Sequence, residues 1–434
     1  MTSALLTDRY ELTMVDAAMK AGTAGRRSVF EVFARHLPSG RRYGVVAGTG
    51  RLLEQIADFR FGPDEIAWLG ENEVVDAETL DWLADYRFGG NVWGYAEGEL
   101  YFPGSPVLIV EGTFAEAVML ETLALSVLNY DSAVASAAAR MVSAADGRPL
   151  AEMGSRRATE RGAVAAARAA YIAGFSATSN LEAGRSWGIP TMGTAAHSFT
   201  LLHDTEEDAF RAQVAALGPD TTLLVDTYDV TAAVDLAVRV AGTELGAVRI
   251  DSGDLPGQAA AVRKQLDGLG AVNTKITVTS DLDEYAIAAL RIAPVDSYGV
   301  GTSVVTGSGA PTAGMVYKLV AHVDDDGKWI PVAKTSTAKK SIGGRKYPVR
   351  LLNGSGLATT EVLHVENGPS DEARPDAGRP LLVPLITGGE ADRRYLGAAG
   401  TALAREHCAA AIAELPLDAF RLARGEPVIP TVYE

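Results

Sequence analysis

The chain has 434 residues, and its 47% hydrophobic and 22% charged composition is that of a globular protein with room for two sizeable cores. Its formal net charge is −16 at pH 7, and it has no block of lysine and arginine of the kind that forms a nucleic-acid face. We therefore expect no nucleic-acid partner, and an anionic substrate has to be attracted by a local pocket or a bound metal.

The single cysteine excludes an intramolecular disulfide and a multi-cysteine zinc site, and it suits a reducing cytosol. Asp8, Arg9 and Glu11 stand where a signal peptide would need an apolar core. The longest apolar-looking stretch, residues 162–177, contains Arg168 and is too short to span a bilayer. These features predict a soluble, cytoplasmic protein with no membrane partner.

The first third of the chain predicts a mixed α+β arrangement. Helical periodicity and capping-box spacing predict a helix over residues 6–21, and alternation predicts a half-buried strand over 28–33. Residues 116–145 are rich in alanine and free of glycine and proline, which predicts one long helix. Between these segments we expect three helices and two strands, at 49–59, 63–69, 77–86, 91–95 and 106–111.

From about residue 150 the rhythm changes to short strands separated by helical segments. The seven predicted strands cover residues 150–153, 174–178, 191–194, 222–225, 247–250, 276–279 and 297–300. Strands that alternate with helices predict a parallel sheet, and this many units predict a barrel-like closure.

The C-terminal part predicts a β-hairpin from 317–323 and 329–333 and a helix over 400–412. Its glycine, proline and short strands indicate a second domain shared with the N-terminal segment. We therefore expect an α/β barrel over 113–335 and an α+β domain built from 1–112 and 336–434.

Polar residues follow each of the seven predicted strands. Singly, each cluster is explained as a helix cap, a turn, a solvated pair or a hydrogen-bonded core histidine. In barrels and open α/β sheets, however, ligands bind at the carboxyl ends of the strands, so seven polar endings predict the wall of one pocket. These endings are Gly154-Ser155-Arg156-Arg157, Thr178-Ser179-Asn180, His197-Ser198, Asp226-Thr227-Tyr228-Asp229, Asp251-Ser252-Gly253-Asp254, Ser280-Asp281-Leu282-Asp283 and Gly301-Thr302-Ser303.

The predicted pocket combines groups that suit a sugar carrying phosphates. Its arginines can bind phosphate or carboxylate in forked geometry, and Gly301-Thr302-Ser303 offers N–H groups and hydroxyls where a helix begins. Carboxylates at the strand ends can hold Mg²⁺ or sugar hydroxyls. The arginines are Arg156, Arg157 and Arg249, and the carboxylates are Asp226, Asp251, Asp254 and Asp281.

Six motifs occur in a fixed order along the chain. They are Leu6-Thr7-Asp8-Arg9-Tyr10-Glu11-Leu12-Thr13-Met14, Glu152-Met153-Gly154-Ser155-Arg156-Arg157-Ala158, Thr178-Ser179-Asn180, Gly193-Thr194-Ala195-Ala196-His197-Ser198-Phe199, Arg249-Ile250-Asp251-Ser252-Gly253-Asp254 and Gly299-Val300-Gly301-Thr302-Ser303. By these motifs the chain resembles the nicotinate phosphoribosyltransferases, a family of type II phosphoribosyltransferases, over nearly its whole length. One departure is Ala177, where the family often has glycine before Thr-Ser-Asn.

The resemblance implies an irregular α/β barrel with a second domain from both chain ends, and a homodimer whose active sites lie at the subunit interface. The implied reaction joins nicotinate to 5-phosphoribosyl 1-diphosphate (PRPP), giving nicotinate mononucleotide and diphosphate. It is the first step of NAD salvage from nicotinate. The resemblance also implies coupled ATP hydrolysis through a phosphohistidine, and Mg²⁺.

The resemblance assigns roles to individual residues. His197 matches the phosphorylated histidine, with Ser198 beside it. Tyr10 matches the aromatic side chain that stacks on the pyridine ring in the neighbouring subunit's site. Arg249 and Thr194 match positions that contact nicotinate.

Further positions match the ribose and phosphate contacts. Asp251 matches a partner of the ribose hydroxyls, and with His197 and Arg249 it completes our candidate catalytic set. Arg156 and Ser179 are additional candidate substrate contacts, and the 5′-phosphate region matches Ser280, Asp281, Gly301 and Thr302. Nicotinamide-using relatives carry an aspartate where this chain has Ser179, so the neutral residue favours nicotinate over its amide.

Three alternatives remain open at the level of the sequence. The same fold can act on nicotinamide or quinolinate, or it can be a catalytically silent barrel that binds a nucleotide and regulates a partner. An unrelated phosphate-binding barrel lyase or isomerase is the third. No lysine ends a predicted strand to form a Schiff base, which argues against aldolase chemistry.

Overall fold

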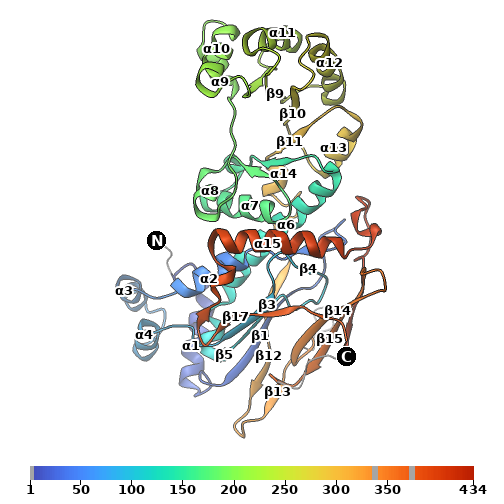
Figure 1. Cartoon of the computed structure of the whole chain (residues 1–434). Helices are drawn as coiled ribbons and strands as arrows, with labels where there is room; N and C mark the ends of the chain where they lie inside the picture. Colours follow the sequence, from blue (N-terminus) through green and yellow to red (C-terminus); the bar gives the residue numbers. More distant parts are fainter. Residues whose placement is uncertain (1–3, 335–340, 371–376) are drawn as a thin grey trace. The chain divides into compact units, whose positions relative to one another are not determined.

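The computed structural model describes residues 4–334, 341–370 and 377–434 of the chain (Figure 1). The chain forms two compact units, one from Met1–Ser136 with Ala310–Glu434 and one from Ala137–Gly309. Residues 113–136 and 310–334 thus group with the chain ends, whereas we expected them in the barrel domain. Residues from 310 onward group with the N-terminal segment because β12 (Met315–Val323) pairs antiparallel with β1 (Arg27–Ala34). The boundary expected between residues 335 and 336 lies outside the described residues.

The end-built unit is organised on a seven-stranded sheet with the order β13-β12-β1-β5-β3-β17-β18. β1 was expected to be half-buried, but every residue after Arg27 in it is buried, because the strand is central and pairs with β12 on one side and β5 on the other. The remaining strands of this sheet are β3 (Asn91–Tyr95), β5 (Leu108–Thr113), β13 (Trp329–Pro331), β17 (Leu382–Thr387) and β18 (Glu390–Ala391).

Two smaller sheets complete the strands of this unit. The four-stranded sheet has the order β16-β14-β15-β19, and β2 pairs with β4. These strands are β2 (Gly44–Val45), β4 (Leu100–Tyr101), β14 (Arg345–Leu352), β15 (Ala358–Glu366), β16 (Arg379–Pro380) and β19 (Thr431–Tyr433).

The helix predicted over 116–145 is divided into α5 (Phe114–Val118) and α6 (Glu121–Ala145). The start of α5 has a local cause, since Thr113 and Glu116 form a capping box at its first turn. The first helix, α1 (Arg9–Lys20), begins later than expected. The boundary between the two units, after Ser136, falls within α6. The other helices of the first unit are α2 (Thr49–Asp58), α3 (Pro63–Glu71), α4 (Ala77–Ala84) and α15 (Gly397–Ala413).

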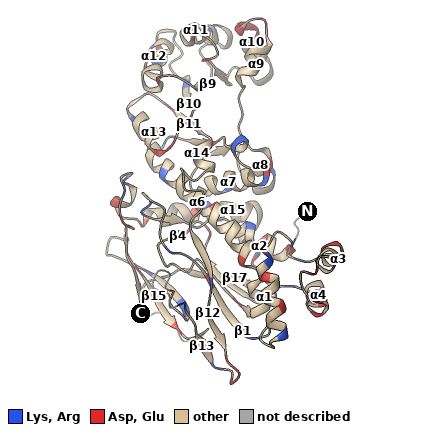
Figure 2. Ribbon diagram, turned by 180° about the vertical axis from the view of Figure 1, so that it is seen from behind, with Lys and Arg blue, Asp and Glu red and all other residues tan. Residues whose placement is uncertain are grey.

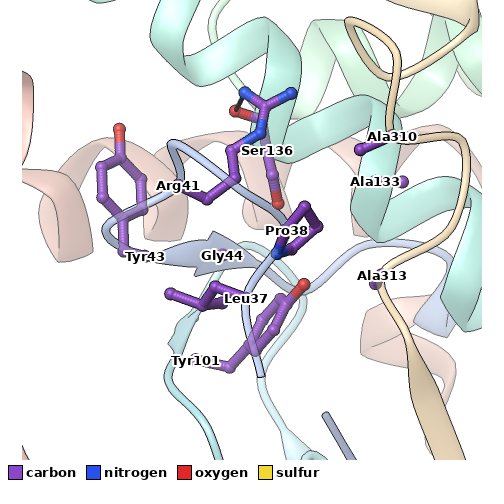
Figure 3. A pocket seen from close by; sticks show the side chains of 10 residues that line it. All are labelled: Leu37, Pro38, Arg41, Tyr43, Gly44, Tyr101, Ala133, Ser136, Ala310 and Ala313. Atoms are coloured by element: carbon purple, nitrogen blue, oxygen red, sulfur yellow. Dashed lines mark hydrogen bonds between the residues drawn. The ribbon is translucent and has the colours of Figure 1, made fainter. Parts of the chain in front are cut away.

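A small cavity of about 10 Å³ lies beside the β2–β4 pair (Figure 3). Arg41 donates to the backbone carbonyl of Ser136 at 3.3 Å, and the Tyr101 ring packs directly over Gly44. A Cβ at Gly44 would come within 2.1 Å of that ring, so only glycine fits here. The cavity has the size of one water molecule and polar groups in its wall.

Buried charges join the two chain ends within this unit. Arg350 of β14 is 1% exposed and donates to Glu99 at 2.7 Å and to Glu361 of β15 at 2.6 Å. Glu99 also accepts from Arg379 at 2.7 Å and contacts the His407 ring nitrogen at 2.9 Å. Burial alone raises the pKa of Glu99, but the hydrogen bonds of His407 and Arg379 and the charge of Arg350 lower it well below its ordinary value.

The second unit contains one parallel sheet with the order β7-β6-β11-β10-β9-β8. In Figure 1 its strands form a curved layer with α11, α12 and α13 along the outside. The first and last strands of the unit, β6 and β11, are hydrogen-bonded neighbours in the middle of the sheet, and its outer strands β7 and β8 do not pair with each other within the described residues, so the sheet is a curled half-barrel. The strands are β6 (Leu150–Glu152), β7 (Ala177–Thr178), β8 (Thr222–Leu224), β9 (Ala247–Ile250), β10 (Lys275–Val278) and β11 (Ser297–Val300).

The helices of the second unit separate these strands, which confirms the predicted α/β class and the parallel sheet; the predicted barrel-like closure takes the form of a curled half-barrel. The strand predicted over 191–194 is reduced to one bridge, between Thr191 and Thr178. Gly193 weakens the extended segment, and the helix that follows starts at His197. The helices are α7 (Glu160–Ile172), α8 (Leu181–Trp187), α9 (His197–Leu202), α10 (Glu206–Leu217), α11 (Val230–Ala241), α12 (Leu255–Gly268), α13 (Glu284–Ala289) and α14 (Thr302–Val305).

Positive and negative side chains are interspersed along the helices of both units (Figure 2). In the part of the chain that the structure describes, no helix is long and apolar enough to cross a membrane.

Arg350→Met should lower the free energy of unfolding by about 3–5 kcal/mol, because Glu361 then stays buried with only neutral donors from Tyr95 and Ser105. Urea denaturation followed by tryptophan fluorescence measures the change, and hydrogen exchange in β14 and β15 locates it. As a control, Arg211→Met removes an exposed ion pair with Glu207 and should cost less than about 1 kcal/mol. Equal, small effects of the two variants would contradict the structural role of the buried network.

Candidate active site

The candidate site lies at the carboxyl ends of the parallel strands of the second unit. Parallel strands end at one edge of a sheet, so the polar residues that follow them come together there. Contacts in the structure join the predicted cluster at His197 with those that follow β8 and β9, and the cluster that follows β6 with the one that follows β7.

His197 is the first residue of α9, and its ring is held between two residues that follow β8. Its Nδ1 lies 3.2 Å from the Thr227 hydroxyl, and its Nε2 lies 3.8 Å from Oδ1 of Asp226. The side chain is 40% exposed, whereas that of Asp226 is 2% exposed. One edge of the imidazole is therefore oriented by the protein while the ring stays accessible.

Asp226 connects the loops that follow β8 and β9. Its Oδ2 accepts a hydrogen bond from the backbone N–H of Asp251 at 2.9 Å and another from the Ser252 hydroxyl at 2.8 Å. Its Oδ1 is buried and has no hydrogen-bond partner among the described residues. A buried carboxylate oxygen without a donor is costly, so this atom is poised to accept a proton-bearing group or a cation.

Arg249, on β9, supplies a partly buried positive charge. Its Nη1 donates to the Thr194 hydroxyl at 2.5 Å, which brings together two residues expected to contact the same substrate group. Burial lowers the pKa of Arg249, and the positive charge of Arg156 lowers it further. The negative charges of Asp251 and Asp226 raise it. The guanidinium remains charged at any physiological pH and suits a planar carboxylate.

The Asp251 side chain is held by a residue at the end of a third strand, β10. Its side chain accepts a hydrogen bond from the hydroxyl of Thr279, which directly follows β10. The next residue, Ser280, has a backbone φ of 115°, a value that residues other than glycine rarely adopt. Such strain is concentrated at functional sites, where it holds a backbone in a required geometry.

Gly301 stands between β11 and the short α14. A Cβ at this position would lie 3.3 Å from the Met153 carbonyl, so the absence of a side chain permits close approach of two strand ends. On the far side of β6, Asn180 caps α8 and donates to the Ser155 hydroxyl at 3.0 Å.

Several predicted residues are placed at this edge with exposed side chains. They lie at the surface of the unit, and their roles remain predictions from the resemblance. They are Arg156, Ser179, Ser198, Ser280, Asp281 and Thr302. Tyr10 belongs to the other unit, in α1, where its side chain is 43% exposed.

The sequence assigned no role to two polar residues that support this site, Glu152 and Thr279. Glu152 is fully buried at the end of β6, accepts hydrogen bonds from Thr178 and the N–H of Gly154, and has a pKa that burial raises. Thr279 holds Asp251. The signal that could have found them is their position, since each is the last polar residue of a predicted strand.

A preformed metal cage is not part of this arrangement. Among the described residues, no group of three or more His, Cys, Asp or Glu side chains is placed to hold a metal ion. The unpartnered Oδ1 of Asp226 is the kind of oxygen that Mg²⁺ accepts, and Mg²⁺ commonly uses one or two carboxylates together with substrate phosphates. The residues present thus fit a metal ion that arrives with a phosphorylated substrate.

Comparisons with known proteins agree over the full chain. Residues 5–129 match the family model described as the N-terminal domain of nicotinate phosphoribosyltransferase. A nicotinate phosphoribosyltransferase of Mycobacterium tuberculosis is 58% identical over 435 residues, covering 98% of this chain and 94% of that protein. One of Bacillus subtilis is 36% identical over 363 residues, covering 81% of this chain and 74% of that protein.

Solved structures show the same architecture. Human nicotinic acid phosphoribosyltransferase matches with a TM-score of 0.83 at 27% identity, covering 99% of this chain and 97% of that one. A nicotinate-nucleotide pyrophosphorylase from Pyrococcus furiosus matches with a TM-score of 0.74 at 25% identity, covering 96% and 95%. The chain therefore belongs to the nicotinate phosphoribosyltransferase family.

Proposed function

We propose that this protein joins nicotinate to PRPP, giving nicotinate mononucleotide and diphosphate, with ATP hydrolysis coupled through a phosphohistidine at His197. The observation that carries the proposal is the 58% identity to a nicotinate phosphoribosyltransferase along 98% of the chain. We assign the reaction to the cytoplasm, as the first step of NAD salvage from nicotinate.

Recognition of nicotinate rests on Arg249 and Thr194. The Arg249 guanidinium is already desolvated and hydrogen-bonded to Thr194, so it can receive the substrate carboxylate without further ordering. Its Nε is buried and has no hydrogen-bond partner within the described chain, which leaves a donor for that carboxylate. We place Ser179 nearby as a neutral residue that does not repel the acid.

The sugar and phosphate groups of PRPP occupy the neighbouring strand ends. Asp251, fixed by Thr279 and Asp226, is the proposed acceptor for the ribose hydroxyls. The 5′-phosphate is assigned to the backbone and hydroxyl groups that follow β10 and β11, with Arg156 as a further cation. The residues are Ser280, Asp281, Gly301 and Thr302.

The bond-forming step needs positioning more than proton transfer. The pyridine nitrogen attacks C1 of the ribose with its own lone pair, the bond from C1 to the diphosphate oxygen breaks, and diphosphate leaves with that electron pair. No general base is required, because the nucleophilic nitrogen carries no proton. Mg²⁺, which Asp226 can help to hold, supplies charge neutralisation for the leaving group.

ATP coupling depends on the geometry around His197. A neutral imidazole nitrogen attacks the γ-phosphorus of ATP, and the bond to the bridging oxygen breaks so that ADP leaves. Water later cleaves the nitrogen–phosphorus bond and releases phosphate. Thr227 and Asp226 orient the ring for this reaction, and Ser198 lies beside it in the first turn of α9.

Because Asp226 contacts His197 and also the Asp251 backbone, it links the phosphorylated residue to the ribose contact through one carboxylate. A change in the charge of the His197 ring therefore acts directly on the loop that receives PRPP. This linkage supports coupling between ATP hydrolysis and PRPP use.

The purified protein should form nicotinate mononucleotide from nicotinate, PRPP and Mg²⁺, faster when ATP is present, and should use nicotinamide far less well. Chromatography of the products with each substrate, with and without ATP, measures this. Arg249→Ala should raise the KM for nicotinate by roughly thirtyfold or more, because it leaves the carboxylate without its cation.

Arg239→Ala, which removes an exposed arginine of α11, serves as the matched control and should leave the KM unchanged. A wild-type protein that prefers nicotinamide, or that forms no mononucleotide, would overturn the proposed function.

His197→Ala should abolish ATP hydrolysis and the gain in PRPP use that ATP provides. A slow synthesis that does not depend on ATP should persist, because His197 does not form the bond to the ribose. Incubation with ATP labelled at the γ-phosphate tests for an acid-labile phosphoryl group on the protein. Label that still appears on the variant shows that another residue is the acceptor.

We further propose a homodimer in which Tyr10 of one subunit completes the other subunit's site. Mixing Tyr10→Ala with His197→Ala subunits should then restore part of the ATP-coupled activity, since each hybrid dimer has one site with both residues intact. Tags on the two variants allow hybrid dimers to be isolated and counted. Hybrids that form and recover nothing argue against a shared site.

A further inference from the structure

Two buried residues of the sequence motifs have no role in the proposed function. Glu152 ends β6 and Thr178 ends β7, and the two are partners in the parallel pairing of these strands. Both are fully buried. Thr178 directly precedes Ser179, and Glu152 stands four residues before Arg156. The pair therefore lies at the start of the two loops that carry these proposed substrate contacts.

The Glu152 carboxylate is shared by the two loops. Its Oε1 accepts a hydrogen bond from the backbone N–H of Gly154, and its Oε2 accepts one from the Thr178 hydroxyl at 2.6 Å. The Thr178 oxygen in turn accepts a hydrogen bond from the backbone N–H of Asn180 at 3.0 Å. An ionised carboxylate accepts on both oxygens, so this side chain satisfies one donor from each loop at once.

These bonds hold the backbone at Ser179 and at the residue that follows it. The N–H of Ser179 donates to the backbone carbonyl of Glu152 at 2.9 Å. The next N–H, that of Asn180, is the one bound by Thr178. The Asn180 side chain also donates to the Ser155 hydroxyl at 3.0 Å, which ties the loop after β7 to the loop after β6. The position of each loop thus depends on the other.

The loop after β6 is closely packed where it meets the carboxylate. A Cβ at Gly154 would lie 2.2 Å from Cγ1 of Val305 and 2.9 Å from Oε1 of Glu152. Only glycine therefore lets this backbone N–H approach the carboxylate so closely. The start of the loop is confined between the Glu152 side chain and α14, to which Val305 belongs.

Both donors to the Glu152 side chain are neutral groups. Burial raises the pKa of Glu152, whereas the hydrogen bonds from Thr178 and from the Gly154 N–H lower it. A buried carboxylate carries a desolvation cost, which an apolar side chain filling the same space would not have. The cost and the two bonds together indicate that Glu152 serves to fix the two loops.

We propose that Glu152 is a positioning residue for substrate binding, which sets where Ser179 lies relative to Arg156 by holding the loops after β6 and β7 on one buried carboxylate. This inference rests on the proposed function, in which Ser179 lies beside nicotinate and Arg156 beside the phosphate of PRPP. Glu152 itself touches no substrate. It acts on the affinity for both substrates and takes no part in the chemical step.

Two variants break the link between the loops. Glu152→Gln places an NH₂ group against a donor where the carboxylate accepted, and Thr178→Val removes the hydroxyl while keeping its shape. Each should raise the KM for nicotinate and the KM for PRPP about three- to tenfold, with kcat within about twofold of wild type, because the substrate contacts are no longer held in place before binding. The double variant should show less than the product of the two rises, since both changes disrupt the same set of bonds.

Two further variants separate this role from a purely structural one. Thr178→Ser keeps the hydroxyl and should stay near the wild-type KM values. Thr277→Val is the matched control, because it removes a hydroxyl that lies 2.8 Å from the Ser297 hydroxyl between β10 and β11 of the same sheet. It should lower the Tm without moving either KM. Should Glu152→Gln fail to fold, the Thr178 variants still decide the matter.

An unchanged KM for either substrate in Thr178→Val, rises that multiply in the double variant, or an equal rise in Thr277→Val overturns the inference. Failure of the wild-type protein to make nicotinate mononucleotide overturns the proposed function instead, so the two failures are distinguishable.

Discussion

The unit built from the two chain ends depends on one buried guanidinium. Arg350 lies between Glu99 and Glu361 and also donates to the Leu100 carbonyl at 2.8 Å. A charge taken out of water is tolerated only when its donors and acceptors are matched, so each of these residues requires the others. Glu99 comes from the first quarter of the chain and Arg350 from the last, and the network therefore makes one folding unit from two distant segments. Arg379 and His407 extend it by sharing the Glu99 carboxylate.

In the second unit, too, a buried charged side chain connects segments that are separate in the sequence. Asp226 is buried and satisfied on one oxygen by the loop that follows β9, while the other oxygen faces His197. Because β8 and β9 are adjacent parallel strands, their ends lie close enough for one carboxylate to bridge both loops. The sheet thus fixes the distance between the residue assigned to ATP chemistry and the residue assigned to ribose. Thr279, at the end of β10, joins this cluster by donating a hydrogen bond to Asp251.

Most elements were predictable because they follow local rules. The strand over 28–33 and the helices near 49, 63 and 77 appear where alternation and periodicity placed them. The errors have tertiary causes. β1 is buried on both faces because it became the centre of a sheet. Residues 191–194 form only one bridge, and Gly193 weakens the extended segment there. The domain division differs because β12 pairs with β1.

The sequence by itself determined the chemical inventory of the site and its family, since polar residues that follow parallel strands must meet at one edge of the sheet. His197, Arg249, Asp251 and Thr194 were identifiable on that basis and by their motifs. Only the tertiary structure decided which of them touch: Arg249 bonds Thr194, and Asp226 serves both His197 and Asp251. These pairings join residues far apart in the chain, and such contacts are set by the packing of strands and helices against each other, which no local pattern encodes.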